Sequence, residues 1–219
     1  LDRTPRAAGA GQALTQDRLK LMIAYSTVAQ IGYLFLLFPV AMPGAGDAAW
    51  QSKAWIAGIF HALSHACAKA AMFMAAGAIL HAVGRDDKNS LRGLGERMPV
   101  TISALATAGI SIMALPPSGG FIAKWMLLVA AIRTDQWWWA PIMIGGGLLA
   151  AAYIFRMIRY VFLSTPDGAQ PLHPVPRRLE FTALALGLLA LLLGLASVFP
   201  IAVAAIGAPF PENWFMEAL

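Results

Sequence analysis

Five long apolar stretches constrain this chain more than any other feature of its sequence. Crossing the hydrocarbon core of a bilayer takes about 20 helical residues, and each stretch is long enough. Only a helix or a closed barrel satisfies its own backbone in lipid, and the stretches lack the alternation of a barrel strand. The sequence therefore predicts an all-α membrane protein with about five transmembrane helices, at residues 21–42, 54–83, 99–132, 139–162 and 181–205.

The composition argues against a soluble enzyme, a nucleic-acid-binding protein and a disordered chain. Hydrophobic residues make up 59% of the 219 residues and charged residues only 12%, whereas soluble domains usually carry roughly 25% charged residues. Of the 27 charged residues (16 basic plus 11 acidic), the five stretches contain only Lys69, Lys124, Arg156 and Arg159. The basic residues are not gathered into one stripe, so no nucleic-acid partner is expected.

The third stretch contains strong helix breakers. As one helix it would extend about 50 Å, which is more than one crossing needs. Its centre is the run LPPSGGF, from Leu115 to Phe121. Proline removes backbone donors and glycine allows backbone angles that other residues avoid, so we expect the helix to break at Pro116, Pro117, Gly119 and Gly120. The stretch is then either a hairpin of two short spans or one discontinuous span.

The basic loops favour one discontinuous span. Lysine and arginine collect in short cytoplasmic loops, and here they collect in the N-terminal segment, in residues 84–98 and in residues 156–178. All three segments fall on one side of the membrane only if residues 99–132 cross once. We therefore expect five crossings, with the third discontinuous and the N-terminal end in the cytoplasm.

Lys69 lies near the middle of the second stretch, in the run HALSHACAKAAMF. His61, His65 and Lys69 follow one another at intervals of four residues, so they share one helix face. A lysine at membrane depth is costly unless it is solvated, paired or neutral, and histidine can pass protons near neutral pH. The spacing favours a proton relay; the alternative is a lysine that snorkels to the headgroups beside histidines that only pack. No third ligand is nearby in the sequence, so no metal site is expected.

Lys124 follows the expected break. A broken helix in a membrane frees backbone groups, and such a break is tolerated only where protein or a water-filled cavity covers it. A lysine at this point therefore predicts a polar pocket, and the alternative is a structural kink whose lysine reaches an interface. We expect Lys69 and Lys124 to exchange protons, with His61 and His65 connecting them.

Polar residues also occur in the first stretch, in the run AYSTVAQIGY. Tyr25, Ser26 and Gln30 either hold helices together or line a path for water, and the sequence favours neither alternative. Lys20, at the entrance of this stretch, is an interfacial anchor or the end of a proton path.

Sequence motifs for other chemistry are missing from this chain. It contains no glycine-rich phosphate loop and no nucleophile elbow, and Cys67 is its single cysteine. Without paired cysteines, neither an iron–sulfur cluster nor a haem attachment motif is expected. We therefore expect no cofactor, no metal and no catalytic centre in this chain. The five stretches contain no acidic residue, so the carboxylates of a transporter would lie on another segment or subunit.

Four runs together resemble a known family of membrane proteins. The chain contains, in this order, AYSTVAQIGY, HALSHACAKAAMF with GAILHA after it, RGLGERMP and ALPPSGGFIAKW. They are similar to the antiporter-like subunits of complex I (NADH:quinone oxidoreductase), of Mrp-type cation/proton antiporters and of membrane-bound hydrogenase relatives. The resemblance covers about residues 17–163.

The resemblance implies a fold of two inverted repeats of five helices, each with one discontinuous helix and a half-channel. This chain resembles the second repeat and the helix after it, and the first repeat has no counterpart here. The family's lysine on the histidine-bearing helix corresponds to Lys69, with histidines at His61 and His65. The lysine of the broken helix corresponds to Lys124, where some members carry a glutamate.

The function implied is proton translocation through a lysine and histidine relay, as a subunit of a complex I-type oxidoreductase. The alternatives are a subunit of a Mrp-type Na⁺/H⁺ antiporter or of a hydrogenase relative, and a structural membrane scaffold. The expected partners are the lipid bilayer, other membrane subunits of a multi-subunit complex, and protons, with Na⁺ as an alternative ion. A multi-pass protein of the bacterial inner membrane is expected.

Three regions are expected along the chain. Residues 1–19 are predicted to be a polar segment from a loop of a longer chain. Residues 20–163 are predicted to form the antiporter-like transmembrane repeat. Residues 164–219 are predicted to contain a loop, a final transmembrane helix and a tail.

Overall fold

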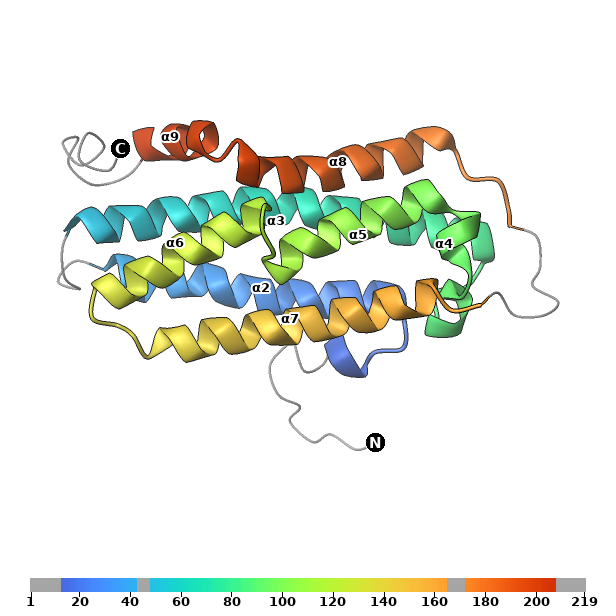
Figure 1. Ribbon diagram of the computed structural model, residues 1–219, viewed down its shortest axis with the longest axis horizontal. Helices are drawn as coiled ribbons and strands as arrows, with labels where there is room; N and C mark the ends of the chain where they lie inside the picture. The colour runs from blue at the N-terminus through green and yellow to red at the C-terminus, as the bar shows by residue number, and fades with distance from the viewer. Residues whose placement is uncertain (1–12, 43–47, 165–171, 208–219) are drawn as a thin grey trace.

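The structure, a computed structural model, describes residues 13–42, 48–164 and 172–207. These ranges form an elongated bundle of helices with no β-strand (Figure 1), as predicted. Four helices are long and apolar enough to cross a membrane, at Leu19–Ala41, Ala49–Val83, Trp139–Val161 and Arg177–Leu195. The helices are α2 (Leu19–Ala41), α3 (Ala48–Val83), η1 (Lys88–Leu91), α4 (Leu94–Arg97), α5 (Pro99–Met113), α6 (Gly119–Arg133), α7 (Trp139–Val161), α8 (Arg177–Leu195) and α9 (Val198–Ile206).

The central helix of the bundle is α3. It packs against α2, α5, α6, α8 and α9. Many of its buried residues are alanines, among them Ala68, Ala71, Ala75 and Ala78, and small residues let helices approach closely in a membrane. Large apolar side chains face outward elsewhere, as expected for helices whose outer surface contacts lipid.

The third apolar stretch forms two helices that follow one another along the bundle. Figure 1 shows α5 and α6 in sequence between α3 and α7, joined by a short loop near the middle of the bundle. Residues 114–118 form this loop, which overlaps the predicted break at Pro116 and Pro117, whereas Gly119 and Gly120 already belong to α6. The arrangement is the discontinuous single span and not the hairpin.

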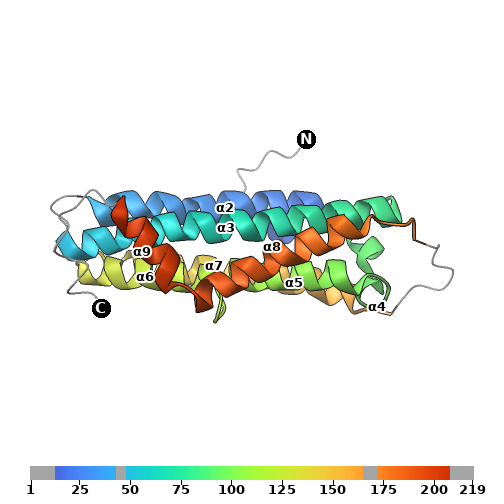
Figure 2. The same cartoon turned by 90° about the horizontal axis from the view of Figure 1, so that it is seen from above.

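The fifth stretch differs from the single helix that its apolar length predicts. It forms α8 and then α9, which Figure 2 shows leaving the line of α8 at an angle. Pro200 gives the physical reason, because in a continuous helix its ring would clash with the carbonyl of Ala196 and it has no N–H to donate. A new helix that begins at Val198 places Pro200 in its first turn, where a missing N–H costs nothing.

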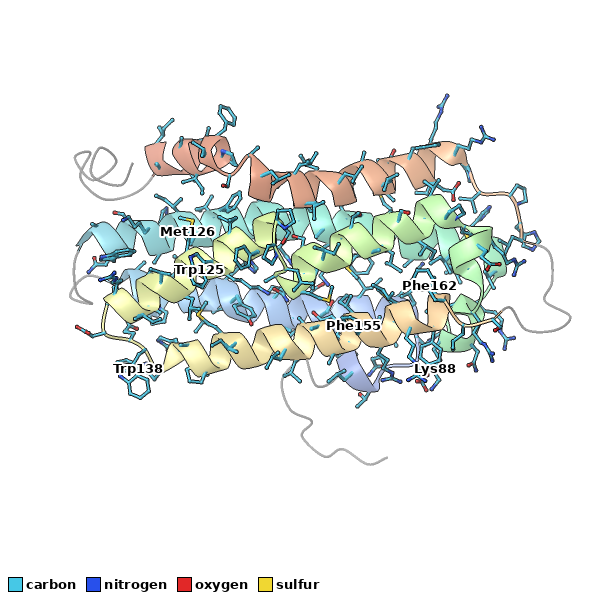
Figure 3. The ribbon with its side chains drawn as sticks, in the orientation of Figure 1. Lys88, Trp125, Met126, Trp138, Phe155 and Phe162 are labelled. Carbon is cyan, nitrogen blue, oxygen red and sulfur yellow. The ribbon has the colours of Figure 1, made fainter. Side chains whose placement is uncertain are left out.

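The described parts of the three basic segments lie at one end of the bundle (Figure 1). Asp17 connects the N-terminal segment to the other two, since its carboxylate accepts hydrogen bonds from Lys88 at 2.7 Å and from Arg156 at 3.0 Å. The hydrogen bond from Lys88 is the largest cause that lowers the pKa of Asp17 below its ordinary value. His173, after α7, donates its backbone N–H to the carbonyl of Ala82 at the same end. In Figure 3, Lys88 and Phe162 lie at this end and Trp138 lies at the other.

Candidate functional site

Lys69 points into the bundle from α3. Lys69 is only 6% exposed. The ammonium donates hydrogen bonds to the carbonyl of Ile23, at 2.9 Å, and to the hydroxyl of Ser26, both on α2. The Ser26 hydroxyl itself donates to the Ile23 carbonyl at 2.8 Å. Oxygens of α2 therefore solvate Lys69, and its geometry is not that of a lysine reaching for a headgroup.

Lys124 is buried beside the end of α5. It is 8% exposed, and its ammonium donates a hydrogen bond to the carbonyl of Ile112 at 3.2 Å. It also lies 4.3 Å from the centre of the Tyr33 ring, a distance typical of a cation–π contact. The last carbonyls of a helix lack partners within the helix and carry its partial negative charge. The end of α5 therefore supplies the negative pole that Lys124 faces.

The residues of the break bring this helix end and Lys124 together. Pro116 and Pro117 are exposed in the loop, while Gly119 and Gly120 are buried at the start of α6. A side chain at Gly120 would lie 2.0 Å from the carbonyl oxygen of Ser111, so only glycine lets α6 begin this close to α5. Ser118 caps α6 by accepting a hydrogen bond from the N–H of Phe121 at 3.2 Å.

The two histidines lie between the two lysines. The His61 and His65 rings are stacked, with centres 5.9 Å apart. His65 is close enough to interact electrostatically with both Lys69 and Lys124, whereas the lysine that acts on His61 is Lys124. Within the described residues, no ring nitrogen of either histidine has a hydrogen-bond partner. Lys69, His65 and His61 thus follow one another along α3, and Lys124 on α6 lies against the Tyr33 ring that also faces His61.

A polar row on α2 faces the same groups. Besides Ser26, it contains Gln30, whose amide donates to the Ile112 carbonyl at 3.4 Å, and Tyr33, whose hydroxyl donates to the backbone carbonyl of Met143. The Tyr33 ring also lies 6.0 Å from that of His61. Of the polar residues predicted on the first span, the structure therefore brings Ser26 and Gln30 to the lysines.

Tyr25 and Lys20 lie elsewhere. Tyr25 is half-buried and packs against the core, and Lys20 is half-buried in the first turn of α2, at the basic end of the bundle. No hydrogen bond joins either residue to Lys69 or Lys124 in the described part of the chain.

Three further polar residues belong to the site and were missed by the sequence reasoning. Ser64 and Ser111 are hydrogen-bonded at 3.0 Å and join α3 to the end of α5. Tyr153, on α7, is 1% exposed and lies beside Ser26 and Gln30. Ser64 follows His61 by three residues and therefore shares its helix face. This spacing could have identified Ser64 as a site residue from the sequence. Tyr153 gave no such signal, because its neighbours in the sequence are apolar or belong to the basic end.

An open cleft of about 270 Å³ reaches Lys124 from the side of the bundle. It lies between α6 and α7, and most of its lining is apolar, with Trp125, Leu128 and Met143 among the residues. Lys124 and Tyr33 bring polar groups to it. A molecule or ion that enters this cleft between α6 and α7 would therefore meet Lys124.

The charged site is purely cationic within the described ranges. The ion pairs found there join exposed and half-buried side chains at the basic end and do not include Lys69 or Lys124. The same ranges contain no group of three His, Cys, Asp or Glu side chains that could hold a metal ion. The titratable groups that the described residues bring to the site are amines, imidazoles and hydroxyls.

The sequence matches the family described as NADH:quinone oxidoreductase/Mrp antiporter, TM, over residues 7–150. It is 33% identical over 170 residues to NADH-quinone oxidoreductase subunit N of Desulforudis audaxviator, covering 77% of this chain and 32% of that protein. It is 36% identical over 133 residues to a Na(+)/H(+) antiporter subunit of Alkalihalophilus pseudofirmus, covering 58% of this chain and 16% of that protein.

The fold is similar to a chain in the structure of the Mrp complex from Dietzia sp. DQ12-45-1b. The TM-score is 0.79 at 23% identity, over 96% of this chain and 46% of that chain. This chain spans about a third or less of the two curated relatives and less than half of the structural relative. The sequence motifs predicted this family. The family match covers more than half of the chain, and the chain therefore belongs to the NADH:quinone oxidoreductase/Mrp antiporter transmembrane family.

Proposed function

We propose that this chain translocates protons across a membrane as an antiporter-like subunit of a complex I-type oxidoreductase. Lys69 and Lys124 hold and exchange protons, and His65 and His61 connect them. The observation that carries the proposal is two lysines buried at the level of a broken membrane helix and joined by a row of titratable and hydroxyl side chains. Relatives with named roles in NADH-quinone oxidoreductase and Na(+)/H(+) antiporters support it.

The environment of both lysines supports proton exchange. Among the described residues, each ammonium is held by neutral oxygens and not by a carboxylate. Without a fixed counter-ion, the balance between the charged and neutral forms of a buried lysine depends strongly on other charges nearby. A charge that moves in a neighbouring subunit can therefore load or unload Lys69 and Lys124 in turn.

The organisation of the whole protein follows from this function. Residues 20–163 act as the second antiporter-like repeat, and α8 follows as a supporting helix. The first repeat, the redox groups and the carboxylates lie in other sequence or in other subunits of the complex. The protein is placed in the bacterial inner membrane with the basic end of the bundle in the cytoplasm.

The lysines provide the direct test. Lys69→Met and Lys124→Met keep most of the side-chain volume and remove the titratable amine. Each is expected to slow proton transport by about a hundredfold, the lower range for losing a positioned proton-transfer group. Transport is measured with a pH-sensitive dye in vesicles that carry the protein in its native complex, and complex content is measured on the same vesicles.

Lys53→Met is the matched control, because Lys53 lies outside the site and its ammonium rests over the Trp50 ring at 4.1 Å. This variant is expected to keep normal transport. Normal proton transport in both Lys69→Met and Lys124→Met would contradict the relay and favour a structural scaffold instead.

The second candidate is a subunit of a Mrp-type Na⁺/H⁺ antiporter, which works without an oxidoreductase. It is favoured by the relative in Alkalihalophilus pseudofirmus. Purification of the intact complex separates the two. Partners with flavin and iron–sulfur absorption indicate the respiratory complex, whereas Na⁺-dependent proton exchange by a complex without these chromophores indicates the antiporter.

A further inference from the structure

The cleft beside Lys124 opens on the outer surface of the bundle. It has a volume of about 270 Å³, and its rim carries exposed apolar side chains, among them Trp125 on α6 (labelled in Figure 3) and Ile144 and Leu148 on α7. Apolar side chains that face outward from a membrane bundle contact lipid chains. An apolar molecule dissolved in the bilayer can therefore reach this cleft without crossing water.

Lys124 gives the cleft one positive group with a donor to spare. An ammonium has three N–H donors. In the described part of the chain, one of them donates to the carbonyl of Ile112 at 3.2 Å, and the centre of the Tyr33 ring lies 4.3 Å from the nitrogen. The ion pairs within these ranges do not include Lys124. One donor and the positive charge are therefore left for a ligand.

The rest of the cleft complements an apolar chain. Apart from Lys124 and Tyr33, the residues that line it are apolar or aromatic, and no acidic residue is among them. No side chain of the lining therefore repels an anion. Binding sites for small molecules have this character, with mostly apolar walls and a few polar groups that fix the orientation of the ligand. The complementary ligand is a long apolar chain with one acidic group.

We infer that this cleft binds a long-chain fatty acid, with its carboxyl group on Lys124 and its chain along the apolar walls formed by α6 and α7. A hydrogen bond between a carboxylate and an ammonium is roughly twice as strong as one between neutral groups. The acid and the amine share one proton and carry no net charge together, whichever of them holds it, so the pair suits an apolar site. The inference goes beyond the proposed function, because binding does not require Lys124 to pass its proton on.

The depth of Lys124 selects a free fatty acid over a phospholipid. About 14 Å of α6 separate Lys124 from Arg133 at the end of the helix, next to the exposed Trp137 and Trp138, which are typical of an interface. The hydrocarbon core is about 30 Å thick, so Lys124 lies well inside it. A phosphate that stays charged remains among the headgroups, whereas a carboxylic acid becomes neutral on taking up a proton and can reach this depth.

Photolabelling of the native complex in vesicles tests the inference. The probe is palmitic acid with a diazirine in the first half of its chain, and its matched control is the alcohol with the same chain and diazirine. Mass spectrometry locates the crosslinks. The acid is expected to label the cleft walls about tenfold more than the alcohol does, as for the gain of one charge-assisted hydrogen bond. The exposed Leu189 and Leu192 on α8 should be labelled equally by both probes and provide the reference.

Two glycines on α7 provide matched variants. Gly147 lines the cleft, and nothing lies within 4 Å of a Cβ atom at that position, so Gly147→Phe extends into open space and fills the cleft. Gly145 has the same open surroundings but does not line the cleft, so Gly145→Phe is the control. Gly147→Phe is expected to lower acid labelling of α6 by about fivefold or more, as for displacing a few methylene groups from an apolar surface. Gly145→Phe is expected to leave the labelling unchanged.

Lys124→Met tests the carboxyl group separately from the chain. It removes the charge and keeps most of the side-chain volume, so the acid and the alcohol are expected to label the cleft equally in this variant. The content of assembled complex is measured for every variant. The comparison of acid with alcohol in the unchanged protein needs no variant and holds even where a substitution impairs folding.

Three results would overturn the inference. Equal labelling of the cleft by acid and alcohol in the unchanged protein would show contact with bilayer chains only. A preference for the acid that persists in Lys124→Met would place the carboxyl group elsewhere. Labelling of α8 without any labelling of the cleft walls would show that a neighbouring subunit covers the cleft in the native complex.

Discussion

At the scale of single residues, two lysines are kept in an apolar bundle without any carboxylate partner in the described ranges. An ammonium in low dielectric must be hydrogen-bonded or neutral. Here Ile23 and Ile112 supply backbone carbonyls to Lys69 and Lys124. A carbonyl dipole holds a cation less firmly than a full negative charge does. Each lysine is thus held in place by carbonyl dipoles and not by a full negative charge of a described residue.

The two histidines are expected to contribute unequally. His65 interacts with both lysines, whereas His61 interacts with Lys124 alone among them. His65→Gln should therefore slow proton transport by about three- to tenfold, and His61→Gln should slow it less, because the Tyr33 hydroxyl remains near Lys124. Initial rates of proton transport in vesicles test this order.

His81 provides the control for that comparison. It lies near the end of α3, away from the lysines, and His81→Gln is expected to leave the rate unchanged. Equal rates for His61→Gln and His65→Gln would contradict the unequal contributions expected of the two histidines.

At the scale of elements, α8 closes the outer side of the broken helix. It packs against α3, α5 and α6. A side chain at Gly194 would lie 1.7 Å from the carbonyl oxygen of Pro117, so the absence of a side chain lets α8 contact the loop between α5 and α6 directly. Backbone that leaves regular helix inside a membrane must be covered by protein or line a cavity, and α8 provides that cover.

Gly194→Ala is therefore expected to destabilise the protein by about 1–3 kcal/mol, because the new methyl group overlaps backbone that cannot move without opening the break. Gly145→Ala, on α7, is the matched control. Nothing lies within 4 Å of a side chain at that position, so alanine should stabilise the helix by up to about 1 kcal/mol. Thermal unfolding of the purified complex in detergent measures both, and an unchanged midpoint for Gly194→Ala would contradict the close contact.

At the scale of the whole molecule, the two ends of the bundle differ in charge. One end carries the ion pairs among Asp17, Lys88 and Arg156 and the pair between Arg18 and Asp86. The opposite end carries exposed Trp137 and Trp138. Basic loops favour the cytoplasmic side of a membrane and tryptophans favour either interface. We therefore expect the basic end of the bundle to face the cytoplasm.

Cysteine labelling tests this orientation. In a Cys67→Ala background, Asn89→Cys and His173→Cys should react with a membrane-impermeant maleimide in inside-out vesicles, while Trp137→Cys should react only from the opposite side. Labelling of Asn89→Cys and His173→Cys from different sides would contradict the single discontinuous crossing. Labelling of both from the outer side of intact cells would reverse the orientation.

The sequence alone predicted the helical membrane fold, the break between Leu115 and Phe121, and the family. These features depend on local quantities, namely the length of each apolar stretch, the low helix propensity of proline and glycine, and the cost of a charge in lipid. The same cost singled out Lys69 and Lys124, which the structure places inside the bundle. The break before α9 depends on one further local signal, Pro200. The length of an apolar stretch takes no account of a proline within it.

Only the tertiary structure decided which groups meet the lysines. Ile112 contributes a backbone carbonyl, which no side-chain pattern reveals, and it meets Lys124 because the start of α6 packs closely on the end of α5. Tyr153 reaches Ser26 because α7 packs on α2, more than a hundred residues away in sequence. The sequence by itself determined which charges lie in the membrane. The packing of helices distant in sequence determined what solvates them, because those contacts depend on distances that periodicity and composition do not contain.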